Sequence, residues 1–115
     1  MSGIKDIIAE DFQLAAASAL TRNKSLPDAL SKYGTSSARL VRSCVKASTQ
    51  CGCIGALEKG QPAGICDKCR GAVEKEMGDA LFYLAGIANA LGISIYDVMI
   101  EEKQRLELFK NYSLM

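Results

Sequence analysis

The sequence predicts an all-α protein. Apolar residues recur at three- and four-residue steps along most of the chain. No stretch shows sustained period-two alternation, and no Asn-Gly or Asp-Gly pair joins two apolar runs. The 115 residues, 49% hydrophobic and 23% charged, suit one globular domain. We therefore expect a single domain over residues 1–115, folded as a bundle of four to five helices.

The first helix is expected over about residues 4–20, on one apolar stripe. That stripe contains Ile4, Ile7, Ile8, Phe12 and Ala15. Ser25 followed by Pro27 is typical of an N-cap with proline in the first turn, and it predicts a short helix to about Lys32. Gly34 should end that helix. Thr35-Ser36-Ser37 should then cap a further helix, whose expected inner stripe is Leu40, Val41, Cys44 and Val45.

A cysteine-rich loop is expected over about residues 49–69, because glycines and prolines concentrate there. The main helix should follow, to about Leu91. Gly92 stands where a left-handed C-terminal cap belongs. Ser94 with Asp97 three residues later predicts the N-cap of a last helix that reaches about Lys110.

The main helix is apolar over most of its circumference around Phe82, Leu84, Ile87 and Leu91. A helix of this kind is buried on more than one side. Because so short a chain supplies few partners for it, we expect a homodimer or a homotetramer with a shared core.

Four cysteines form two closely spaced pairs, Cys51-Gly52-Cys53 and Cys66-Asp67-Lys68-Cys69. Four thiolates on two short turns are typical of tetrahedral zinc, and a site filled by four protein ligands is structural. The alternatives are an iron–sulfur cluster, a redox-active dithiol or unligated cysteines. Cys44 stands apart, on a predicted inner face, and is expected to be a small buried hydrophobe.

Glu76 and Asp79 lie three residues apart on the predicted main helix, so they project from the same face. Two carboxylates that converge can share a hard divalent cation such as Mg²⁺. The alternative is that both lie at the solvated start of the helix, where acidic groups favour the positive end of the helix dipole.

Composition excludes some chemistry. The chain has no histidine, which leaves carboxylates and thiolates as its ligands and bases. A net charge of +1, dispersed Lys and Arg and the lack of tryptophan disfavour a nucleic-acid partner. The longest apolar run is too short to span a bilayer, so no membrane partner is expected. Five cysteines without an export signal suggest a reducing, cytoplasmic location.

The segment Glu76-Met77-Gly78-Asp79-Ala80-Leu81-Phe82-Tyr83-Leu84, with Leu91-Gly92-Ile93-Ser94 after it, resembles the MazG-like all-α nucleoside triphosphate pyrophosphohydrolases. The resemblance extends over residues 73–107. It implies a MazG-like bundle in which Glu76 and Asp79, as an ExxD pair, bind Mg²⁺ and act in hydrolysis of a nucleoside triphosphate to a monophosphate and pyrophosphate. It also implies that Lys103 on the last helix contacts substrate.

The family's second acidic motif, EExxE on the preceding helix, is not matched. Arg42, Ser43 and Lys46 occupy its three acidic positions, and basic groups there would repel Mg²⁺ or form ion pairs with Glu76 and Asp79. Three hypotheses follow. The protein is a pyrophosphohydrolase with an incomplete acidic site, a non-catalytic zinc-stapled module that binds a nucleotide or a protein partner, or a thiol-based redox or metal sensor.

Overall fold

A computed structural model describes residues 4–19, 25–55 and 64–114, with side chains between residues 8 and 110 of these ranges. The regular structure is helical and consists of α1 (Ile4–Ala19), α2 (Leu26–Lys46), the π-helical turn η1 (Ala47–Cys51), α3 (Asp67–Leu91) and α4 (Ile95–Leu114). These described residues contain no strand. The prediction of an all-α chain of four to five helices is confirmed for these residues, which form four α-helices.

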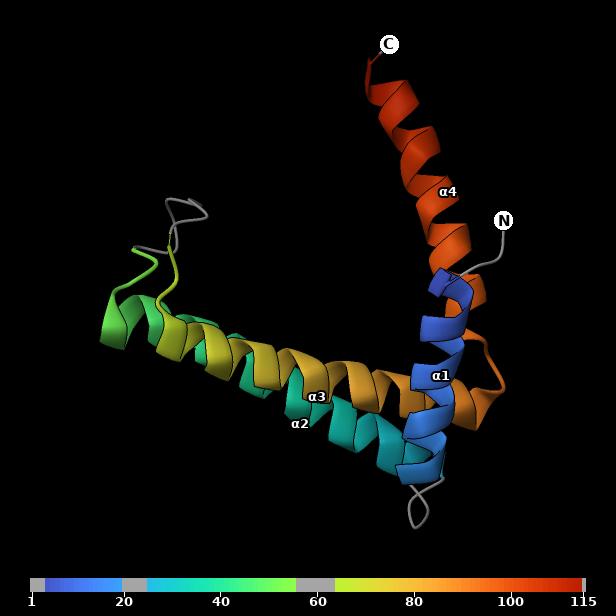
Figure 1. The fold of residues 1–115 in the computed structure, drawn as a ribbon, viewed down its shortest axis with the longest axis horizontal. Helices are drawn as coiled ribbons and strands as arrows, with labels where there is room; N and C mark the ends of the chain where they lie inside the picture. Colours follow the sequence, from blue (N-terminus) through green and yellow to red (C-terminus); the bar gives the residue numbers. More distant parts are fainter. Residues whose placement is uncertain (1–3, 20–24, 56–63, 115) are drawn as a thin grey trace.

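Helices α2 and α3 lie side by side and antiparallel along their whole lengths, and they form the body of the molecule (Figure 1). The seam between them is built from small side chains. The buried residues are Ala29 and Ser36 of α2, Ala47 of η1 and Ala80 of α3. Small residues at these positions let the two backbones approach closely, so the seam excludes water without large side chains.

The prediction of two separate helices over residues 25–46 is wrong, because α2 is continuous through Gly34. Ser25 does cap it, accepting a hydrogen bond from the Asp28 N–H. Ser37, expected in a second cap, instead donates to the Gly34 carbonyl at 3.1 Å inside the helix. A mid-helix glycine costs about 1 kcal/mol. Packing along the full length of α3 outweighs that cost.

The predicted inner stripe of α2 is half right: Leu40 and Cys44 are half-buried, but Val41 and Val45 are exposed. Val41 is 63% exposed and Val45 is 37% exposed, whereas the buried positions are Ser36 and Ala47. Leu40 and Ser43, both half-buried, complete a stripe with four-, three- and four-residue steps. Hydropathy favours valine over serine at a helix interface, but a close helix–helix approach requires the smaller side chain.

Helix α1 crosses the far end of α3 (Figure 1). Ala16 of α1 and Ala85 and Ala88 of α3 are buried. Gln13 joins α1 to the turn between α3 and α4. Its Nε2 donates to Asn89 Oδ1 at 3.0 Å and to the Ile93 carbonyl at 2.6 Å. Its Oε1 accepts from the Ile95 N–H at 2.8 Å, and Asn89 Nδ2 donates to the Gln13 carbonyl at 3.1 Å.

The turn after α3 follows the prediction. Gly92 has φ +68° and ends α3, and the Ser94 hydroxyl accepts from the Asp97 N–H at 3.2 Å to begin α4. Helix α4 then leaves the α2–α3 hairpin at a bend of 106° and projects away from it (Figure 1). None of the described helices, taken singly, is long and apolar enough to cross a membrane; α3 and α4 reach that standard only as this bent pair.

Candidate metal centre

The first cysteine pair lies on a turn at the end of η1, at the end of the hairpin away from α1 (Figure 1). Gly52 has φ +80°, and its N–H donates to the Ala47 carbonyl at 2.9 Å. Gly55 has φ +74°, and its carbonyl accepts from the Ser48 hydroxyl at 2.6 Å. Because L side chains rarely adopt such φ values, glycine is required at both positions for the chain to fold back beside Cys51 and Cys53.

The second pair begins α3. Cys66 is the N-cap residue, and its sulfur accepts from the Cys69 N–H at 3.5 Å. Cys69 lies one turn into the helix, so both sulfurs face the same side. The first turn of α3 is therefore anchored by the same residues that form the cysteine cluster.

The sulfur atoms of Cys51, Cys53, Cys66 and Cys69 all lie within 4.8 Å of one another. Cys51 Sγ and Cys66 Sγ are 3.8 Å apart. A tetrahedral ion with metal–sulfur bonds of about 2.3 Å places its ligands about 3.8 Å apart, so these four cysteines could hold one metal ion. An iron–sulfur cluster interposes further atoms between its thiolates, so this compact group favours a mononuclear site.

The electrostatics of the cluster also favour a cation. The Cys69 backbone N–H, then the Cys69 thiol, lower the pKa of Cys66 to about 7. The pKa of Cys69 is raised to about 12, first by the hydrogen bond between Cys69 and Cys66 and then by burial. The hydrogen bond with Cys66 also raises the pKa of Cys51. The cluster thus favours ionisation of Cys66 and opposes that of Cys51 and Cys69, so four thiolates need a bound cation to coexist at neutral pH.

A hollow of about 400 Å³ adjoins the cysteine cluster between α2 and α3. Its polar lining includes Lys46 from the end of α2, Gln50 from η1 and Lys68 from the start of α3, together with Cys51 and Cys69. Sequence analysis missed Lys68 and Gln50 as site residues. The position of Lys68 inside the CxxC pair was the available signal, since a residue there must lie beside the metal.

The two predicted acidic ligands do not form a site with other carboxylates. Glu76 is half-buried, and its Oε1 is buried without a hydrogen-bond partner. Asp79 Oδ2 accepts from Lys75 Nζ at 3.1 Å. Among the described residues, the cysteines are the one group of three or more potential ligands that converge. Glu76 therefore offers one free oxygen toward Mg²⁺, while Asp79 is already paired, and the set does not fit a complete Mg²⁺ site.

Two of the three missing acidic positions are basic, and among the described residues neither Arg42 nor Lys46 forms an ion pair with Glu76 or Asp79. Arg42 and Lys46 are exposed, and the partner of Asp79 is Lys75 on its own helix. Asp79 pairs with Lys75 because residues four apart on a helix are neighbours, so no group from α2 is needed.

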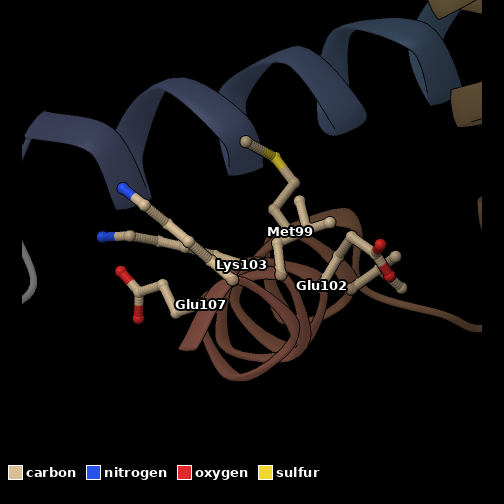
Figure 2. Close-up of a pocket in the computed structure, with 7 residues that line it drawn as sticks. Met99, Glu102, Lys103 and Glu107 are labelled. Atoms are coloured by element: carbon tan, nitrogen blue, oxygen red, sulfur yellow. The ribbon is translucent and has the colours of Figure 1, made fainter. Parts of the chain in front are cut away.

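Lys103 is not brought together with Glu76 and Asp79, because it lies on α4, beyond the bend. It lines a hollow of about 520 Å³ made by α4 side chains. In Figure 2, Met99 points toward α1, with Glu102 on one side of it and Lys103 and Glu107 on the other. Lys103 thus belongs to a different surface from the predicted acidic pair.

Comparison of the chain with protein-family models, with curated proteins and with solved structures gives no match in any of the three.

Proposed function

We propose that the protein is a zinc-stapled helical module that binds the phosphate groups of a nucleotide in the hollow beside the cysteine cluster. The observation that carries the proposal is the placement of Lys46 and Lys68, from two different helices, on one hollow next to four convergent thiolates. Zinc held by the thiolates would fix the ends of α2 and α3 and so hold the two ammonium groups in place. Because the thiolates require a reducing compartment, the proposal includes a cytoplasmic location.

The surrounding charge supports an anionic ligand. Arg39, Arg42 and Lys46 recur at three- and four-residue steps, so they share one side of α2. Arg39 lies close enough to Lys75 of α3 to oppose the rise in the pKa of Lys75 that Asp79 causes. Together with Lys68, these basic groups offset Asp79, Glu76 and the net double negative charge of a zinc tetrathiolate.

The test is titration calorimetry of the zinc-loaded chain with ribo- and deoxynucleoside triphosphates. Lys68→Gln should weaken binding about tenfold or more, because a charge-assisted hydrogen bond contributes about 1.5–3 kcal/mol. Arg70→Gln is the matched control, since Arg70 is an exposed cation on the same turn of α3 but outside the hollow. Equal loss of binding in both variants would show a general charge effect and would contradict a specific site.

A second candidate is a MazG-like nucleoside triphosphate pyrophosphohydrolase, and the unpartnered Oε1 of Glu76 favours it. A carboxylate oxygen buried without a partner is costly, so it is commonly matched by a cation or a proton in the working state. Mg²⁺, when bound, would supply neutralisation of phosphate charge and a more acidic water. The resemblance of residues 73–107 to that family is the other support, and Lys103 stays a predicted substrate contact.

The two candidates separate in one assay of pyrophosphate release from nucleoside triphosphates with Mg²⁺ or Mn²⁺. If the protein is the enzyme, the unaltered chain releases pyrophosphate and the Glu76→Ala variant does not. Glu74→Ala is the control, because Glu74 is an exposed carboxylate two residues away on the same helix. Nucleotide binding without release would leave the module as the function. Failure of both binding and release would reject both candidates.

A further inference from the structure

Among the residues whose side chains the structure describes, no core of large side chains is found. The buried apolar residues are alanines, and the largest side chain that is fully buried among the described residues is Ser36. Large apolar side chains are instead exposed, above all on α4. Those of α4 include Val98 (50% exposed), Met99 (56%), Leu106 (57%), Leu108 (58%) and Phe109 (69%). An apolar surface of this kind requires a partner to remain stable in water.

The surface area indicates how large that partner contact is. The chain exposes 8567 Å², whereas a compact protein of 12.3 kDa exposes about 6100 Å². The excess of about 2500 Å² exceeds the roughly 800 Å² that each partner buries in a standard stable complex. The radius of gyration agrees, at 17.0 Å against about 13 Å for a compact domain of 115 residues. An excess of exposed area this large is in the range that permanent interfaces bury.

One face of the molecule has both a projection and a matching hollow. A hollow of about 430 Å³ in the angle between α1, α3 and α4 is almost wholly apolar. It is lined by Ile8, Ala9, Phe12, Leu81, Leu84, Ile95 and Met99. The projection is the stripe of Met99, Leu106 and Phe109 along α4, at steps of seven and three residues, which places them on one side of the helix. A surface with both parts is self-complementary, as a two-fold interface requires.

The charges of α4 fix the orientation. Residues 95–102 contain three acids and no base, whereas residues 103–110 contain three bases and one acid. Two copies of α4 side by side and antiparallel would place each acidic half against a basic half, but a parallel pair would place like charges together. Antiparallel pairing also brings Phe109 of one copy level with Ile95 and Met99 of the other, at the rim of the apolar hollow.

We propose that a second copy of this chain covers the apolar side of α4, with the two α4 helices antiparallel and Phe109 of each copy seated in the hollow of the other. The proposal rests on the apolar surface and on the charges of α4. It is therefore independent of nucleotide binding and of the metal identity.

The test is sedimentation equilibrium of the full chain with its metal bound, across a range of concentrations. The unaltered protein should have twice the monomer mass of 12.3 kDa, or a multiple of that dimer mass. Phe109→Glu should weaken association about 100-fold or more, since each dimer loses two buried aromatic anchors. Leu108→Glu is the matched control: its side chain is also exposed, but its place on the helix is away from the stripe, so the dimer should persist. Far-ultraviolet circular dichroism shows that both variants are folded.

Charge reversal tests the orientation. Glu101→Lys with Glu102→Lys should weaken the dimer, because both halves of α4 then become basic. Adding Lys103→Glu and Arg105→Glu should restore it, since opposite halves face each other again. Four results would each overturn the proposal: the unaltered protein is monomeric, Phe109→Glu leaves association unchanged, Leu108→Glu weakens association as much as Phe109→Glu does, or the restoring changes fail to restore the dimer. If the unaltered chain is monomeric alone and its apolar surface is covered by an unrelated protein, the proposal is also overturned.

Discussion

Removal of the proposed metal is the perturbation whose effect the structure predicts most directly. The cluster joins Cys51, at the end of the α2–η1 helix, to Cys66, at the start of α3, 15 residues later. Without a metal, the two helices at this end are joined through the intervening loop and the hairpin seam. The seam there consists of small side chains such as Ala47, which bury little apolar area.

The magnitude follows from the entropy of loop closure. Closing a loop of about 15 residues contributes about 3 kcal/mol to stability. The unfolding entropy of a chain of 115 residues is about 0.24 kcal/mol per kelvin. A loss of 3 kcal/mol therefore lowers Tm by about 12 °C, a large part of the stability of a domain of this size.

The assay is thermal unfolding followed at 222 nm, before and after treatment with a high-affinity zinc chelator. Cys69→Ser should reproduce most of the chelator effect and should not respond further to chelator. Cys44→Ser is the control, because Cys44 lies outside the cluster on α2. An unchanged Tm on chelation of demonstrably metal-loaded protein, or equal losses in the two variants, would refute the metal as the staple of the hairpin.

Three further outcomes are expected. Gln13→Ala removes three hydrogen bonds and should cost about 3 kcal/mol, measured as a lower urea midpoint that the exposed Gln50→Ala does not share. Ala80→Leu overfills the helix seam and should cost about 1–3 kcal/mol; an unaltered Tm would argue against close α2–α3 packing. In metal-free protein, iodoacetamide should alkylate Cys66 first. Because its pKa is lowered to about 7, the rate should be half-maximal near pH 7 and fall as acid protonates the thiolate, while Cys69, with a pKa of about 12, reacts far more slowly.

The sequence alone determined the features of this protein that depend on local chemistry, which are the helix caps and the cysteine pairs. The Gly92 cap and the Ser94 N-cap depend only on neighbouring backbone atoms, and both form as predicted. The CxC and CxxC pairs place two sulfurs on each of two turns, whatever the rest of the chain does. Their convergence into one group within 4.8 Å is the structural result that confirms a possible metal site.

Tertiary structure decided the features that depend on a neighbouring helix. The length of α3 keeps α2 continuous through Gly34, although glycine and the serines after it favour a break. Close approach of the two backbones selects Ser36 over Val41 for the seam, which hydropathy cannot anticipate. The meeting of Lys46 and Lys68 on one hollow likewise exists only once the hairpin forms, because 22 positions of sequence separate two groups that the antiparallel helices bring to the same side.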